Sequence, residues 1–371
     1  MPFCYTPWSN VDIGSLGQIK PCCKFRSESY NIDFNIQEYT LSEYVNSEFL
    51  DQIKQDFEND QWPVGCIRCR IDEENNIPSK RQLDYDRWSE HYNRYNKETD
   101  GFLTTNIAFG NTCNLKCITC DATASSRWRK EYKELYNITV EHFRIEDNQK
   151  FIDQLFENNL IHLDINGGEP FISEIDLQKE YLTKLINKGI SKDITIHYIT
   201  NATTFPDKDW WELWGNFKEI DMQLSTDGIQ EKYEYIRFPA KWKDFVQNAH
   251  KYMIFEKWIP NLRLSISHTV SAYNIFYLDE FYNWCTDMGL PAPYLGPVYN
   301  PAYMRPTVWP DKEKIINKLN QSNIKEVNNW SSLISSQNDT EYFNEFCMRT
   351  RQHDAYRNLN FNEVFTEMKI L

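Results

Sequence analysis

The sequence predicts an α/β protein in which a partial barrel of six βα units follows a cysteine-rich segment. Two observations predict this fold class. From about residue 103 onward, strand-like segments alternate with amphipathic helical segments, a pattern typical of parallel strands joined by right-handed helical crossovers. In addition, eight of the ten cysteines lie within the first 120 of the 371 residues, so the two parts of the chain differ in composition.

The six strand-like segments are rich in β-branched and aromatic residues, and the first of them ends at Gly110. These segments are 102–110, 160–167, 193–201, 219–228, 262–270 and 291–300. The helical segments between them have apolar residues at helical spacing, and they are 124–136, 174–189, 207–217, 241–257 and 274–289. Six βα units make three quarters of a (β/α)8 barrel. We therefore expect a partial (β/α)6 TIM-like barrel, with functional residues at the C-terminal ends of its strands.

Composition divides the chain into three expected domains. Residues 1–100 are rich in turns and aromatic residues, with one helical stretch near 41–58, and we expect them to form a separate N-terminal module. Residues 101–300 form the barrel. Residues 301–371 begin with several prolines, become helical and irregular, and are expected to pack on the barrel as a C-terminal extension.

Charge and hydropathy exclude several classes of protein. With 54 acidic and 40 basic side chains the net charge is −14, which disfavours a nucleic-acid binder. The sequence has no long uncharged apolar run and its first ten residues do not resemble a signal peptide, so we expect a cytoplasmic protein without a membrane span. Cytoplasmic cysteines stay reduced, and Cys285 and Cys347 are expected to be buried structural thiols.

Three cysteines follow the first strand in the segment "NTCNLKCITC". Cys113, Cys117 and Cys120 lie within eight positions, at the point where a barrel places its functional loops. A disulfide cannot use three thiols, and a structural zinc site usually takes four ligands. A 4Fe-4S cluster also takes four thiolates, so three would leave one iron open to a ligand that is not protein. Zinc with a distant fourth ligand is the alternative.

The Cys-x3-Cys-x2-Cys pattern resembles that of the radical S-adenosylmethionine (radical SAM) superfamily. The resemblance implies that S-adenosylmethionine chelates the open iron and is cleaved reductively to a 5′-deoxyadenosyl radical, which abstracts a hydrogen atom from the substrate. It also implies an electron donor of the flavodoxin or ferredoxin type. One position departs from the family, because Thr119 stands where an aromatic residue commonly precedes the third cysteine.

Polar and glycine-rich strand ends extend the resemblance: "NGGEP" after the second strand, "YITNAT" after the third and "LSTDG" after the fourth. Each could instead be an ordinary turn or a polar cap of the next helix. Arg237 could meet the cofactor carboxylate or form a surface ion pair. The residues that the resemblance assigns to the cofactor are Gly167, Gly168, Glu169, Pro170, Thr200, Asn201, Ser225, Asp227, Arg237 and Leu295.

A second group of cysteines precedes the barrel. The segment 2–23 reads as a β-hairpin with Gly17 at its turn, and "VGCIRC" supplies a Cys-x2-Cys pair. Together they resemble the auxiliary-cluster module called Twitch, one half of a SPASM domain, here placed N-terminal to the barrel. The resemblance implies a second, fully ligated 4Fe-4S cluster, with zinc as the less favoured occupant. Its ligands would be Cys4, Cys22, Cys66 and Cys69, with Cys23 competing with Cys22 for one position.

The resemblance implies an enzyme whose substrate the sequence does not identify. The leading hypothesis is oxidative or bond-forming modification of a peptide or protein side chain. Dehydrogenation of a small polar metabolite of the amino-sugar alcohol type is the first alternative, and peptide epimerisation is another. The alternative outside the enzymes is a non-catalytic protein that binds an iron–sulfur cluster or zinc. The sequence assigns no catalytic acid, base or hydrogen donor and no oligomeric state.

Overall fold

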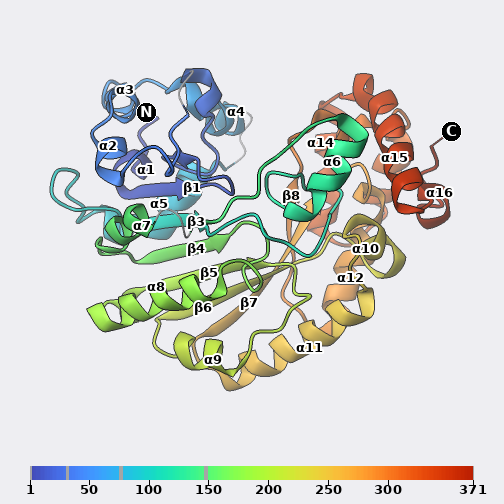
Figure 1. The fold of residues 1–371 in the computed structure, drawn as a ribbon. Coiled ribbons are helices and arrows are strands. Elements are labelled where there is room, and N and C mark those ends of the chain that lie inside the picture. The colour runs from blue at the N-terminus through green and yellow to red at the C-terminus, as the bar shows by residue number, and fades with distance from the viewer. Residues whose placement is uncertain (1, 31–32, 75–77, 146–148, 371) are drawn as a thin grey trace. The chain divides into compact units, whose positions relative to one another are not determined.

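The computed structural model describes residues 2–30, 33–74, 78–145 and 149–370 (Figure 1). The chain divides into two compact units, each built from several segments. Unit 1 comprises residues 1–112, 141–198 and 206–220, and unit 2 comprises residues 113–140, 199–205 and 221–371.

The strands form one mixed sheet that is mostly parallel. They are β1 (Asn10–Ile13), β2 (Ile19–Lys20), β3 (Thr104–Ala108), β4 (His162–Asn166), β5 (Thr195–Thr200), β6 (Glu219–Ser225), β7 (Leu262–Val270) and β8 (Tyr294–Pro297). Their order in the sheet is β2-β1-β3-β4-β5-β6-β7-β8. From β3 onward the spatial order follows the chain order, as expected when each crossover returns the chain to the next position. Each of the six predicted strands is present.

Unit 1 begins with the predicted hairpin. β1 and β2 are antiparallel, with Ile13 opposite Ile19, and Gly17 lies in the turn. β1 is also parallel to β3, with Ile13 opposite Ile107, and Figure 1 shows β1, β3 and β4 side by side. The helices of this unit are α1 (Thr6–Ser9), α2 (Leu41–Val45), α3 (Glu48–Glu58), α4 (Ile67–Glu74), α5 (Lys80–Tyr92), α7 (Gln149–Phe156), α8 (Ile175–Lys188) and α9 (Lys208–Trp214).

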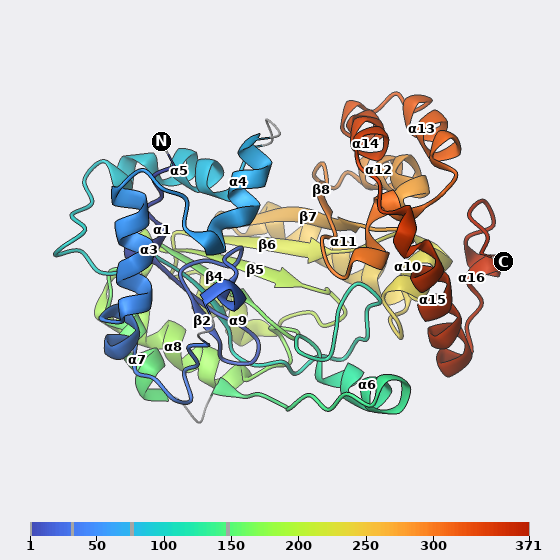
Figure 2. The ribbon, with the colours of Figure 1, turned by 90° about the horizontal axis from the view of Figure 1, so that it is seen from above.

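Unit 2 contains the cysteine loop after β3 and most of the C-terminal half. Its helices are α6 (Arg129–Tyr136), α10 (Gln230–Ile236), α11 (Trp242–Trp258), α12 (Leu278–Met288), α13 (Lys312–Asn320), α14 (Lys325–Ser336), α15 (Phe343–Arg357) and α16 (Phe361–Val364). The core of the unit is strongly aromatic, and Tyr273, Phe346 and Phe361 pack in it with ring centroids 4.9–5.9 Å apart. Figure 2 shows α13 to α16 grouped together.

One helical segment differs from the sequence prediction. The helical stretch near 41–58 is divided, because α2 ends at Val45 and Ser47 caps a new helix, α3, by accepting a hydrogen bond from the Leu50 amide. The N-terminal hairpin extends the sheet, because β1 hydrogen-bonds directly to β3. The domain boundaries at residues 100 and 300 stay predictions.

Two further expectations concern the structural thiols and a membrane span. Cys285 and Cys347 are buried, as predicted for structural thiols. Among the described residues, no helix is both long enough and apolar enough to span a bilayer.

Candidate functional site

The loop that carries Cys113, Cys117 and Cys120 leaves the C-terminal end of β3 and is held by main-chain hydrogen bonds. The Lys116 amide donates to the carbonyl of Phe238 at 2.6 Å, and the Ile118 amide donates to that of Ile236 at 2.7 Å. These bonds resemble the pairing of a strand edge, and they fix the loop backbone on both sides of Cys117. The cysteines are therefore held in place before any ligand binds.

Side chains that follow the loop hold it from the other direction. The Trp128 indole donates to the carbonyl of Cys117 at 3.0 Å, and the Ser125 hydroxyl donates to that of Leu115 at 2.6 Å. Trp128 is 1% exposed, so its ring supports the loop from inside the core. The "Ser-Ser-x-Trp" continuation of the cysteine motif thus has a structural role in this chain.

The three cysteines of the loop are partly buried. Burial raises the pKa of the Cys117 thiol to about 12, and the positive charge of Arg237 opposes that rise. Burial and the neighbouring Cys117 raise the pKa of Cys120 well above its usual range. A thiolate here needs a cation to stabilise it, because the surroundings alone favour the neutral thiol.

The "NGGEP" turn after β4 packs directly on the end of the β3 strand. Gly168 has a φ of +55°, and a Cβ atom there would lie 2.2 Å from the carbonyl oxygen of Thr112. The Glu169 amide donates to that same oxygen at 2.8 Å. Gly168 therefore lies close to the backbone of Thr112, the residue before Cys113.

Buried positions surround the same turn. A Cβ atom on Gly167 would meet the Cβ of Ala108 at 2.3 Å, so glycine is required there as well. Glu169 is 1% exposed and its carboxylate accepts a hydrogen bond from the Phe171 amide at 3.3 Å. Pro170 is also buried.

The polar pair after β5 contacts the cysteine loop within unit 2. The Asn201 amide nitrogen donates to Asn114 Oδ1 at 2.9 Å and lies 3.9 Å from Cys113 Sγ. Thr203 links to both asparagines through its hydroxyl. Thr200 is 1% exposed and accepts a hydrogen bond from the Ala202 amide. Asn201 therefore positions the start of the cysteine loop.

The charged pair after β6 is an ion pair, and it is buried rather than on the surface. Arg237 Nε lies 3.0 Å from Asp227 Oδ2, and the Asp227 side chain is 0% exposed. The other carboxylate oxygen accepts a hydrogen bond from the Thr269 amide at 2.8 Å. Ser225 lies two residues before Asp227, 3.1 Å from the hydroxyl of Ser267. The alternative of a surface ion pair for Arg237 is thus wrong.

The remaining predicted contact residue lies on β8. Leu295 is opposite His268 of β7 and packs at the margin of the aromatic core of unit 2. The neighbouring His268 is buried against the ring of Phe281, and burial lowers its pKa to about 4.

Glu131 is a residue of this region that sequence reasoning did not single out. It lies on α6, just after the cysteine loop, and is 1% exposed. Its carboxylate meets Lys116 of the loop at 2.8 Å, and His353 and Arg357 of α15 at 2.9 and 3.0 Å. Arg357 also lies over the Trp128 ring, 4.3 Å from its centroid. Residues of α15 thus anchor the helix that follows the cysteine loop.

The electrostatics of this cluster favour an ionised carboxylate. Burial alone would raise the pKa of Glu131, but the hydrogen bond from His353 and the charges of Arg357 and Lys116 lower it to about 2. A glutamate on a charged helix gives no sequence signal of burial, and only the pairing with a segment over 220 residues away reveals it.

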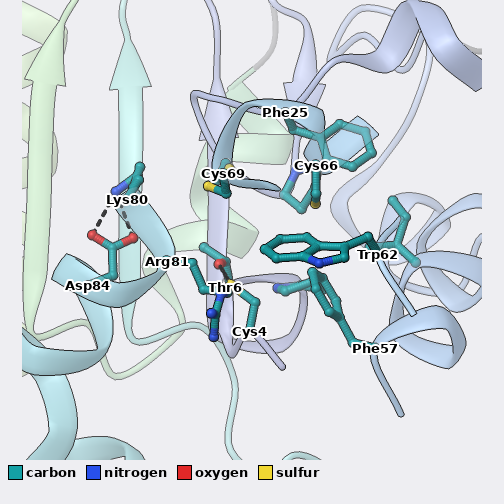
Figure 3. Close-up of a pocket in the computed structure, with 14 residues that line it drawn as sticks. Cys4, Thr6, Phe25, Phe57, Trp62, Cys66, Cys69, Lys80, Arg81 and Asp84 are labelled. Carbon is teal, nitrogen blue, oxygen red and sulfur yellow. Dashed lines mark hydrogen bonds and ion pairs between the residues drawn. The ribbon is translucent and has the colours of Figure 1, made fainter. Parts of the chain in front are cut away.

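The four cysteines predicted for the second site converge in unit 1. Cys4, Cys22, Cys66 and Cys69 all line one pocket, whereas Cys23 is exposed and not part of its lining. Figure 3 shows the pocket, with the Trp62 ring lying between Cys66 and Phe57. Of the four cysteines, Cys4 lies before α1 and Cys22 lies in the loop after β2. Cys66 ends the 3-10 turn Val64–Cys66, and Cys69 lies in the α4 helix that follows it directly.

Cationic and apolar groups complete this pocket. Lys80 and Arg81, at the start of α5, both line it, and Lys80 is paired with Asp84 at 2.7 Å. Burial raises the pKa of Cys4 to about 11 and that of Cys22 well above its usual value. Phe25, Ile53 and Phe57 are among the apolar residues of the lining.

The spacing of the sulfurs distinguishes between kinds of metal site. Tetrahedral zinc with Zn–S bonds of about 2.3 Å places its sulfurs about 3.8 Å apart. Among the described residues, the only group of three or more potential ligands whose atoms all lie within 4.8 Å of one another is His162, Asp164 and His197, which contains no cysteine. Neither cysteine set has the close packing of a mononuclear site.

Comparison with known proteins yields distant structural similarities. No protein-family profile matches the chain, and no curated protein matches it. A structure of anSMEcpe with bound AdoMet aligns with 18% identity and a TM-score of 0.40, covering 54% of this chain and 53% of that one. A Streptococcus suis SuiB structure with the precursor peptide SuiA aligns with 15% identity and a TM-score of 0.41, covering 79% and 61%.

A third similar structure is the radical S-adenosylmethionine methyltransferase TsrM from Kitasatospora setae, with 9% identity, a TM-score of 0.36, and coverage of 52% of this chain and 35% of that one. This chain therefore spans about half the length of the first solved structure it matches.

Proposed function

We propose that this chain is a radical SAM enzyme with two iron–sulfur clusters, one with an open iron and one fully ligated by protein. The observation that carries the proposal is the separation of seven cysteines into a set of three in one anchored loop and a set of four around one pocket. Three thiolates leave a 4Fe-4S cluster one ligand short, and four complete it.

The residues of the three-cysteine loop fit an open cluster. Cys113, Cys117 and Cys120 would ligate three irons. The Leu115 amide lies 3.4 Å from Cys113 Sγ and the Asn201 amide 3.9 Å from it, so N–H groups already point at a sulfur that would carry negative charge. Hydrogen bonds to the sulfurs tune the potential of such clusters.

The remaining strand ends would receive S-adenosylmethionine. When bound, the cluster and the cofactor supply one-electron reductive cleavage and hydrogen-atom abstraction. Gly167, Gly168, Glu169 and Pro170 would present backbone and carboxylate acceptors to the methionyl amine, and Thr200, Asn201, Ser225 and Leu295 would contact other parts of the cofactor. Asp227 and Arg237 hold one another, so their proposed contribution is to fix the loop after β6 and to place a positive charge near Cys117.

The pocket of unit 1 fits a closed cluster better than zinc. Its four cysteines converge, but no three of the sulfurs are as close as a single zinc ion would require. A cube with four thiolates carries net negative charge. The lining includes two cations, Lys80, which is paired with Asp84, and Arg81, which is paired with Glu73. Because Cys22 lines the pocket and Cys23 does not, we assign the fourth ligand to Cys22.

For the substrate we infer a peptide or protein side chain, modified by oxidation or bond formation. An open cluster that makes a radical, together with a closed cluster that accepts one electron, suits a net two-electron oxidation. Electrons would enter from a donor of the flavodoxin or ferredoxin type. A polar metabolite would give the same loss of two hydrogens, so the mass of the product in the presence of candidate peptides decides between the two.

The test is anaerobic reconstitution with iron and sulfide, followed by metal analysis and incubation with S-adenosylmethionine and a strong reductant. We expect about eight irons per chain, two cubes of four, and release of 5′-deoxyadenosine and methionine. Four irons with one zinc would contradict the second cluster. Absence of S-adenosylmethionine cleavage by protein that holds its full iron content would contradict the enzymatic function.

A further inference from the structure

A cluster of two histidines and one aspartate lies on β4 and β5 of unit 1 and contains no cysteine. His162 and Asp164 are two residues apart on β4, so their side chains point to the same face of the sheet. His197 of β5 is directly opposite Asp164 in the parallel register. Figure 2 shows these two strands side by side in the sheet. The three side chains therefore meet because of the strand register.

The ligand atoms of the three side chains are close together. Asp164 Oδ1 lies 2.5 Å from His197 Nδ1 and 3.2 Å from His162 Nε2, and the three ligand atoms all lie within 4.8 Å of one another. The side chain of Asp164 is 29% exposed, that of His197 14% and that of His162 4%. One carboxylate oxygen thus faces two imidazole nitrogens in a largely buried place.

His162 has no structural hydrogen bond that would occupy its other nitrogen. Its Nδ1 atom is buried and has no hydrogen-bond partner in the described part of the chain. The ring packs against Trp88 of α5, with centroids 4.9 Å apart. A buried imidazole with one committed nitrogen is costly if the protein uses it only as a filler of the core.

The residues opposite Asp164 on the neighbouring strands are also polar. Asn106 of β3 is opposite Asp164, and Asp12 of β1 is opposite Asn106. The other face of the same strands is apolar, since Leu163, Ile165 and Ile196 are at most 1% exposed. This face of the sheet therefore carries ligand-type side chains where a packed core would carry aliphatic ones.

We propose that His162, Asp164 and His197 bind one divalent transition-metal ion, such as Zn²⁺. Two imidazoles and a carboxylate are a common ligand set for such ions, with metal–ligand distances of about 2.0–2.2 Å. The ion would replace the direct contact between carboxylate and imidazole. Two ligand atoms at about 2.1 Å from one tetrahedral ion lie about 3.4 Å apart, so Asp164 Oδ1 and His197 Nδ1 would separate from their present 2.5 Å. Three protein ligands leave the remaining positions to water or to a polar group of a bound molecule. This site shares no residue with either proposed iron–sulfur site.

The test uses reconstituted holoenzyme dialysed to equilibrium against ZnCl2, with zinc and iron measured on the same sample. We expect one more zinc per chain in the wild type than in His197→Gln, with iron content equal in the two. The matched control is His250→Gln, because His250 is exposed on α11 and outside the cluster. Equal zinc in wild type and His197→Gln would overturn the proposal. The separate iron value keeps this result distinct from a failure of the proposed enzymatic function.

A second measurement needs no variant and covers the case in which His197→Gln does not fold. X-ray absorption at the zinc edge of the wild-type sample reports the atoms around the ion. We expect nitrogen and oxygen at about 2.0–2.2 Å. A first shell of sulfur alone, at about 2.3 Å, would place the zinc on cysteines and overturn the proposal.

Discussion

The two cysteine regions of this molecule are built in opposite ways. Cys113, Cys117 and Cys120 lie within eight positions of one loop, and their spacing is visible in the printed sequence. Cys4, Cys22 and the Cys66–Cys69 pair come from three separate segments and meet only because these segments are packed together. A local motif fixes the relative positions of its ligands through a few backbone dihedrals, whereas a dispersed one depends on the folding of its whole module.

The two cysteine sets also differ in which parts of the chain support them. The three-cysteine loop is local in sequence, but its support comes from Phe238, Ile236 and the α15 residues that meet Glu131. The four-cysteine pocket is dispersed in sequence, but all of its lining lies within the first 84 residues. Short spacing between ligands therefore does not mean that the site is stabilised locally.

The largest expected effect separates the two regions by activity. Cys117→Ala should abolish S-adenosylmethionine cleavage and lower the iron content from about eight to about four per chain, because the open cluster loses a ligand. Cys66→Ala should lose a similar amount of iron while cleavage of the cofactor continues. Cys23→Ala is the control, since Cys23 is exposed and outside the pocket. Cofactor cleavage by Cys117→Ala at the wild-type rate would reverse the assignment.

A second prediction concerns the support of the three-cysteine loop. Glu131→Ala leaves Lys116, His353 and Arg357 without their buried partner, and removal of one member of such a group costs about 3–5 kcal/mol. Denaturant unfolding of the cluster-free protein would measure this loss in the free energy of unfolding. Lys130→Ala is the matched control on the same helix, where the exposed pair with Glu134 should contribute less than about 1 kcal/mol. Equal effects would show that α6 is not the anchor.

The pH dependence of the same group gives a third prediction. The pKa of Glu131 is lowered to about 2 in the folded protein, against about 4.3 in an unfolded chain. Its contribution to stability is therefore complete above the unfolded value and is lost as the pH falls from about 4.3 toward 2, by roughly 3 kcal/mol. Glu131→Gln should flatten this part of the curve. An unchanged acid transition in that variant would exclude the buried cluster as its cause.

The smallest expected effect compares two glycines with positive φ. Gly168→Ala and Gly189→Ala both place alanine in the left-handed region, at a cost of about 1 kcal/mol. A Cβ atom at Gly168 also meets the Thr112 backbone, whereas at Gly189 nothing lies within 4 Å. We expect Gly168→Ala to be less stable than Gly189→Ala by about 1–3 kcal/mol. Equal unfolding free energies would indicate that the "NGGEP" turn can move away from Thr112.

The sequence was a reliable guide wherever the signal was local. Alternation of apolar and polar residues located all six strands from 102–110 to 291–300, and the hairpin turn at Gly17 was readable from its flanking residues. Cysteine spacing predicts two metal sites, which stay predictions. These features depend on residues a few positions apart, for which periodicity and turn chemistry are sufficient evidence.

Tertiary structure decided the features that depend on pairing between distant segments. β1 joins the sheet beside β3, Asp227 is buried against Arg237, and Glu131 is held by α15. The cluster of His162, Asp164 and His197 exists only because the register sets Asp164 opposite His197. Each residue by itself resembles an ordinary polar residue of a strand or helix. Burial and partner are properties of the packed chain, so by itself the sequence determined which chemical groups are present and the fold determined which of them meet.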